Sequence, residues 1–176
     1  MVSVAGAFAA ASKTVKIRDA IGDVTGPLDL QRASLKRGSD GRLRVVITLA
    51  GKINPAVLLA SSGPPGSICL KVWTARDADP RTMPPDRLVC VTARSKDELR
   101  GSVYTQTSPG PPTRVGPASV GLNATGRSLV LRISQSSLGS PGLIRFALES
   151  TRPGCGRVSC IDLAPDRGGV LRFRVR

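Results

Sequence analysis

The chain has 176 residues, a formal net charge of +14 and an aromatic content of only 3%. It contains no histidine, which excludes Ser-His-Asp and Cys-His catalytic arrangements and any metal site with a histidine ligand. The 19 glycines and 14 prolines disfavour a helical protein and are typical of a chain divided into many short strands. We therefore expect a single domain with an aliphatic core.

The N-terminal residues 1–11 are apolar and small, and they end in overlapping Ala-x-Ala steps. This pattern is similar to the end of a secretory signal peptide, although the basic segment that normally precedes it is missing. The alternative is a disordered or strand-forming N-terminus. We assign 1–12 to a signal-peptide remnant or disordered segment, and 13–176 to one secreted domain. No segment of the sequence approaches the roughly 20 apolar residues that a membrane span needs.

A β-hairpin is the clearest element near the start of the chain. In residues 42–50 apolar side chains alternate with other residues, as in a strand with one face on a core. The preceding Gly-Ser-Asp-Gly segment, 38–41, predicts the turn. In the strand before this turn the apolar residues change parity between Leu30 and Ala33. A β-bulge near residues 31–32 would place both on the core face.

The loop before the hairpin contains Asp19, Asp23 and Asp29, separated by glycine and proline. Over residues 19–50, an aspartate, a Gly-Asp pair, a Gly-Pro-Leu-Asp-Leu run, a bulged strand and a glycine-closed hairpin follow one another. This order resembles the start of secreted β-sandwich domains of the carbohydrate-binding-module-9-like or DOMON-like class of actinobacterial proteins. The resemblance implies a jelly-roll-like sandwich and, in some members, a structural calcium or a sugar ligand.

Seven further strands are expected, at 67–73, 88–93, 99–106, 117–122, 129–133, 144–148 and 171–176. Proline- and glycine-rich loops separate them, and residues 57–60 fit either a helical turn or a strand. This series predicts an all-β, antiparallel, two-sheet β-sandwich of jelly-roll or immunoglobulin-like type. We expect it to be a monomer.

Four cysteines in a chain of this kind indicate disulfides, for which three connectivities exist. Cys69 and Cys90 lie in predicted strands and both point away from the core, so they can meet side by side. Cys155 and Cys160 flank a short loop. We predict the pairs 69–90 and 155–160. The alternative is a four-cysteine zinc site, which the long spacing between the first two cysteines disfavours.

Arginine occupies outward positions of several predicted strands, namely Arg44, Arg132, Arg145, Arg172 and Arg174. If they share one face, that face would attract phosphates or acidic polysaccharides. The alternative is a solubilising surface that reflects composition. The basic residues are scattered along the chain, and no recognition helix or zinc finger accompanies them, so we expect no specific nucleic-acid binding.

Two acidic loops stand out in this basic chain. Asp19, Asp23 and Asp29 belong to the first loop, and Asp162 and Asp166 precede the last strand. If the terminal strands are neighbours, these carboxylates could together offer oxygen ligands to a calcium ion. The alternative is that they stabilise turns or pair with nearby arginines.

Trp73 and Tyr104 are the only tryptophan and tyrosine. Because aromatic rings form the platforms of many sugar sites, we take them as candidate ligand-binding residues, together with Arg172 and Arg174. The alternative for Trp73 is packing beneath the loop 76–87. With only two glutamates, neither beside an aromatic residue, the sequence indicates no glycosidase.

We therefore expect no enzyme but a secreted binding module for cell-wall or environmental glycans. The alternative function is a structural or envelope-associated domain that holds anionic wall polymers through a basic, arginine-rich surface.

Overall fold

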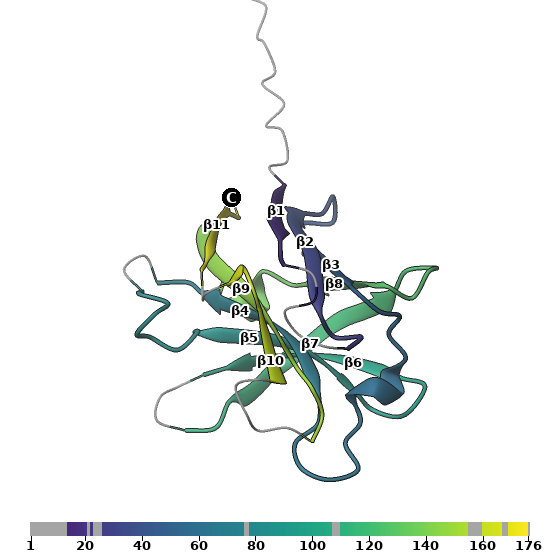
Figure 1. Ribbon diagram of the computed structural model, residues 1–176. Helices are drawn as coiled ribbons and strands as arrows, with labels where there is room; N and C mark the ends of the chain where they lie inside the picture. Colours follow the sequence, from purple (N-terminus) through teal and green to yellow (C-terminus); the bar gives the residue numbers. More distant parts are fainter. Residues whose placement is uncertain are drawn as a thin grey trace, which may run out of the picture.

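The computed structural model describes residues 14–20, 22, 26–75, 78–106, 110–154, 160–166 and 169–175. Strands dominate this part of the chain, which contains two short 3-10 helices and no α-helix (Figure 1). The predicted all-β, antiparallel fold is confirmed. Among the residues described, no helix has the length and apolar character needed to cross a membrane.

In chain order the elements are β1 (Val15–Arg18), β2 (Leu30–Arg37), β3 (Leu43–Leu49), η1 (Pro55–Leu58), β4 (Ser67–Trp73), β5 (Arg87–Ala93), β6 (Leu99–Thr105), β7 (Thr113–Leu122), β8 (Ser128–Ile133), η2 (Ser136–Leu138), β9 (Leu143–Thr151), β10 (Ile161–Ala164) and β11 (Leu171–Arg174).

The strands form one antiparallel sheet in the order β1-β2-β3-β8-β7-β6-β5-β4-β9-β10, with β11 also paired to β9. The long strand β7 joins the two halves, because its residues 113–118 pair with β6 and its residues 119–122 with β8. The sheet curls until β1 contacts β11 and β10 contacts β2, so its shape is nearly that of a barrel (Figure 1). The division into two facing sheets stays a prediction.

The N-terminal hairpin has the expected features. Strands β2 and β3 pair through the turn at 38–41, and their register shifts between Leu30 and Arg32, where the bulge was predicted. The bulge brings residues of both parities to the interior, since Leu30 is 1% exposed and Ala33 6%. This confirms that the change of parity in the sequence marks a bulge.

A single large hydrophobic core fills the curled sheet, and every strand contributes to it. It consists of aliphatic side chains with Phe146 and Phe173 as aromatic members. The strict alternation of the strands explains this, since each second residue points inward. A smaller cluster of Trp73, Ala78 and Ala147 lies outside this core, on the outer side of β4 and β9.

The sequence pattern did not predict two of the strands, β1 and β10. β1 and β10 have four residues each, too few for alternation to stand out. They form because longer strands offer them hydrogen-bond partners: β1 pairs with β2, and β10 with β9.

The ambiguous segment at 57–60 is in part a helical turn, since η1 spans Pro55–Leu58. The Asn54 side chain caps this turn by accepting a hydrogen bond from the Ala56 N–H at 3.1 Å.

Candidate functional site

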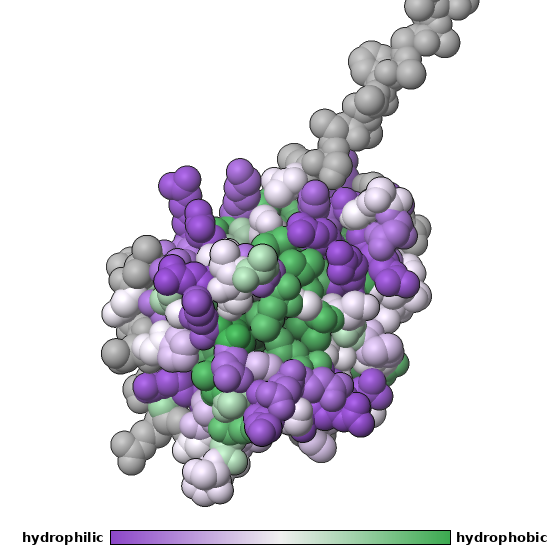
Figure 2. Space-filling view, turned by 90° about the vertical axis from the view of Figure 1, so that its right-hand side faces the viewer, coloured by the Kyte–Doolittle hydropathy of each residue, from purple (hydrophilic) through white to green (hydrophobic). Residues whose placement is uncertain are grey.

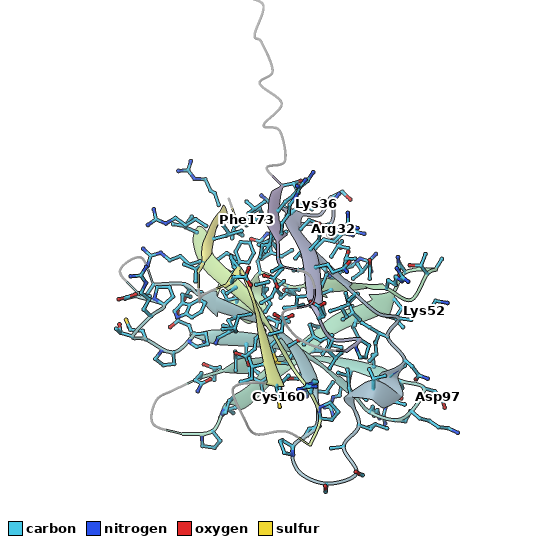
Figure 3. All side chains as sticks on the ribbon, viewed as in Figure 1. Arg32, Lys36, Lys52, Asp97, Cys160 and Phe173 are labelled. Atoms are coloured by element: carbon cyan, nitrogen blue, oxygen red, sulfur yellow. A yellow bond between two sulfur atoms is a disulfide. The ribbon has the colours of Figure 1, made fainter. Side chains whose placement is uncertain are left out.

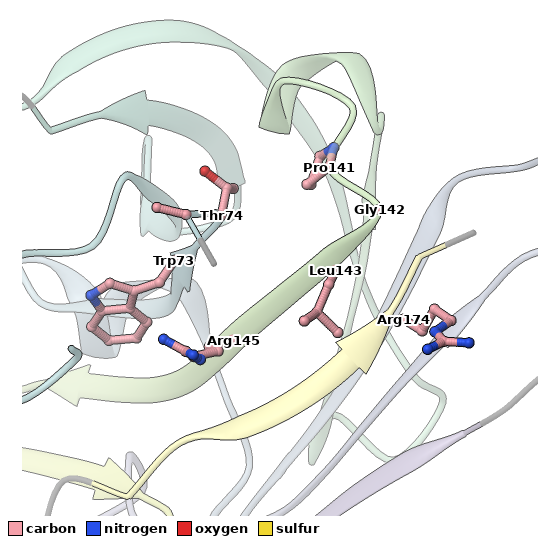
Figure 4. Close-up of a pocket in the computed structure, with 8 residues that line it drawn as sticks. Trp73, Thr74, Pro141, Gly142, Leu143, Arg145 and Arg174 are labelled. Carbon is pink, nitrogen blue, oxygen red and sulfur yellow. The ribbon is translucent and has the colours of Figure 1, made fainter. Parts of the chain in front are cut away.

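The candidate site is an open hollow of about 530 Å³ on the outer side of β4, β9 and β11 (Figure 4). The residues that line it are Trp73, Thr74, Ala75, Pro141, Gly142, Leu143, Arg145 and Arg174. A second hollow, of about 360 Å³, is lined by Val15, Leu143, Arg172 and Arg174. Because both share Leu143 and Arg174, we treat them as one site, which we call the arginine hollow.

Strand register places the arginines of this hollow. Arg145 on β9 lies directly opposite Trp73 on β4 and Arg172 on β11, and Leu143 lies opposite Arg174. Residues opposite one another in a sheet share a face. The arginines therefore point outward, while the intervening apolar residues of β9 and β11 point into the core. The alternation of arginine with apolar residues at the C-terminus is the sequence signal for this arrangement.

The described residues that line the hollow include Arg145, Arg172 and Arg174, and none of them is acidic. Arg172 and Arg174 are exposed, and neither forms an ion pair with another described residue. Arg145 is partly buried and donates a hydrogen bond to the carbonyl of Ala78. The exposed Arg172 and Arg174 can offer their guanidinium groups to an anion.

Trp73 is a wall of the hollow and not an exposed platform. It is 3% exposed, and its indole N–H donates to the carbonyl of Met83 at 3.0 Å. It packs against Ala78 and Ala147. The position of Trp73 therefore agrees with the alternative interpretation of the sequence, in which Trp73 packs beneath the loop 76–87. The second aromatic candidate, Tyr104, is half-buried on β6 and is not among the residues that line the hollow.

The five outward arginines fall into two groups instead of sharing one patch. Arg145, Arg172 and Arg174 belong to the hollow, whereas Arg44 and Arg132 lie opposite each other on β3 and β8. The sequence alone could not separate them, because the separation depends on strand order. Sequence reasoning also missed Leu143, whose 39% exposure in a strand of buried neighbours marks it as part of a surface site.

Parts of the two acidic loops lie close together, because β10 contacts β2. The Asp162 carboxylate accepts a hydrogen bond of 2.6 Å from the N–H of Leu30. The neighbouring Asp29 accepts one of 2.9 Å from the N–H of Gly22. Both side chains are buried, with 1% and 3% of their surface exposed. These bonds fit the alternative interpretation, in which the aspartates stabilise the main chain.

The other acidic candidates are less buried or outside the described part. Asp19 is half-buried, Asp166 is exposed, and Asp23 lies outside the described residues. Among the residues described, no group of three or more acidic or cysteine side chains is placed to hold a metal ion. The calcium site stays a prediction, and a melting temperature that rises with free calcium would support it.

The first predicted disulfide is confirmed. Cys69 and Cys90 lie opposite each other on β4 and β5, with Cα atoms 4.1 Å apart, and their sulfurs are bonded. Both are nearly buried on the outer side of the sheet, as the strand pattern predicted. Cys160 is also disulfide-bonded, while Cys155 lies outside the described residues.

Fold and site together define a disulfide-bonded, all-β domain with an open, arginine-lined surface site. In comparisons with known proteins, no family model, curated protein or solved structure matches the chain. The resemblance to the carbohydrate-binding-module-9-like or DOMON-like class therefore stays a prediction, as does any function that it implies.

Proposed function

We propose that this domain is a secreted, non-catalytic binding module for acidic glycans. The observation that supports it is the arginine hollow, in which Arg145 and Arg172 lie opposite each other, Arg174 lies nearby, and none of the described lining residues is acidic. Guanidinium groups are planar and bind carboxylate or sulfate groups through paired hydrogen bonds. A sugar that carries such a group would satisfy the exposed arginines.

An acidic glycan fits the hollow better than a neutral one. Neutral sugars are held largely by stacking on exposed aromatic rings, and the ring of Trp73 is buried. The apolar surface that remains is that of Leu143 and Pro141, which can contact the carbon face of a sugar ring. Charge would therefore supply most of the affinity, and binding should weaken with added salt.

The proposal that the module is non-catalytic is supported by its two glutamates, which are paired with basic residues and lie outside the hollow. Glu149 pairs with Lys71 at 3.0 Å, and Glu98 pairs with Arg94 at 3.3 Å. Neither lines the arginine hollow.

Secretion is supported by the Cys69–Cys90 disulfide, because such bonds persist in oxidising compartments.

Calorimetric titration with a short oligogalacturonate and with a neutral oligosaccharide of equal length tests the proposal. We expect binding of the acidic ligand only. The double variant R172Q/R174Q should weaken it about tenfold or more, since each hydrogen bond to a charged group is worth about 1.5–3 kcal/mol.

The control is R94Q/R100Q, which removes two arginines at the β5–β6 hairpin, away from the hollow, and leaves the net charge the same as in the test variant. It should change affinity by about twofold or less. Equal losses in the two variants, or tighter binding of the neutral sugar, would overturn the proposal.

A further inference from the structure

A second basic surface lies on the outer side of β1, β2, β3 and β8. Figure 2 shows the side of the molecule that lies to the right in Figure 1, where hydrophilic side chains border a hydrophobic area. Arg32 and Lys36 project from β2 (Figure 3). We call this surface the basic face, and its basic residues are Lys16, Arg18, Arg32, Lys36, Arg44 and Arg132.

The register of the sheet arranges five of these residues in two rows, and Lys16 on β1 lies between the rows, opposite Ser34 on β2. Lys36 on β2 lies opposite Arg44 on β3, which lies opposite Arg132 on β8. In the other row, Arg18 on β1 lies opposite Arg32 on β2. Neighbouring strands are about 4.8 Å apart, and four residues along a strand span about 13 Å. The two rows therefore lie about 13 Å apart on one continuous surface.

Nothing on these strands neutralises the two rows. β1, β2, β3 and β8 contain no aspartate or glutamate, and neither does β7 beside them. None of the six basic residues forms an ion pair with another described residue. Two acidic residues flank these strands in the sequence: Asp40, in the β2–β3 turn, accepts a hydrogen bond of 3.1 Å from the main-chain N–H of Arg42, and Asp19, which follows Arg18, is half-buried. Anions from outside the sheet would relieve the repulsion within the rows.

The shape and composition of the basic face indicate the kind of anion. Rows of charges at regular spacing match a linear polymer with an ionised group on each repeat. The four strands contain no aromatic residue on which bases could stack. The described part of the chain also has no α-helix that could enter a DNA groove.

A membrane surface fits the basic face less well. Between the rows lie the exposed Lys16 and three residues that are small or β-branched and half-buried, namely Ser34, Val46 and Val130. The large exposed hydrophobic residues of the described chain, which could insert into lipid, lie on other elements.

We infer that the basic face binds a linear acidic polysaccharide along its chain, as a second contact surface distinct from the arginine hollow. The hollow would hold one acidic sugar, whereas the basic face contacts several repeats of a chain. The inference does not rest on the hollow. The two sites are separated experimentally by ligand length and by variants on different strands.

Titration with long polygalacturonate at several salt concentrations tests the inference. The test variant K36Q/R132Q removes both ends of the longer row. The control K96Q/R100Q removes one lysine and one arginine from the β5–β6 hairpin, so that the two proteins have the same net charge. We expect about tenfold or more weaker binding in the test variant and a salt dependence that becomes less steep, with about a twofold or smaller change in the control. R18Q/R32Q, in the other row, should reproduce the loss.

Binding of long polygalacturonate should survive in R172Q/R174Q, which disables only the hollow. Equal effects of K36Q/R132Q and K96Q/R100Q would overturn the inference, because net charge alone would then control binding. Tighter binding of duplex DNA or of phosphatidylglycerol vesicles than of polygalacturonate would overturn it as well, and would identify a nucleic acid or a membrane as the partner.

Discussion

The carboxylate of Asp162 accepts a hydrogen bond from the main-chain N–H of Leu30, 132 residues earlier in the chain, at 2.6 Å. This bond joins β10 to β2 at the place where the two ends of the sheet approach each other. A second buried bond at the same junction runs from the Ser150 hydroxyl to the carbonyl of Leu28, at 2.7 Å. Polar side chains thus close the curled sheet where strand pairing ends.

Replacing Asp162 by alanine should destabilise the fold. The change leaves the buried N–H of Leu30 without its acceptor, which costs about 1–3 kcal/mol. Urea unfolding monitored by circular dichroism measures the difference. The exposed Asp166, four residues later, is the control, and its alanine variant should change stability by about 0.5 kcal/mol or less. Equal effects at both positions would show that the bond contributes nothing to closure.

The Cys69–Cys90 disulfide should contribute about 2–5 kcal/mol to stability, since it closes a loop with a sequence separation of 21. The variant C69S/C90S should therefore unfold at a clearly lower urea concentration than the unmodified protein. Peptide mapping without reductant identifies the bond directly. A free thiol at either position in the unreduced, purified protein would contradict the assignment.

Gly101 is required by the close approach of β6 and β7. A Cβ atom there would lie 2.3 Å from the carbonyl oxygen of Ala118, at the point where β7 changes partner from β6 to β8. Gly101→Ala should cost about 1–3 kcal/mol, because the backbone must shift. Gly121 lies on β7, where an added Cβ atom would have open space, so Gly121→Ala should be neutral or slightly stabilising. Thermal melts of the two variants provide the comparison.

The indole of Trp73 should matter for stability more than for ligand binding. Trp73→Phe removes the hydrogen bond to Met83 and should cost about 0.5–1.5 kcal/mol. Affinity for an acidic oligosaccharide should change by about twofold or less, because the arginines supply the charge. A large loss of affinity with unchanged stability would instead identify Trp73 as a stacking platform.

The sequence alone determined the elements whose signal is local. Alternation of apolar residues over 42–50 depends only on neighbouring positions, and so does the parity change between Leu30 and Ala33, so the hairpin and its bulge were predictable. The outward direction of Cys69 and Cys90 followed from the same alternation, and the disulfide confirmed it.

Only the tertiary structure decided which residues share a surface. The separation of Arg44 and Arg132 from Arg145 and Arg172 follows from the order of strands, which pairs β8 with β3 and β11 with β9. The four-residue strands β1 and β10 exist because longer neighbours offer them hydrogen-bond partners, and no local pattern records that. Alternation fixes the side of the sheet to which a residue points, whereas pairing between distant strands fixes what lies beside it.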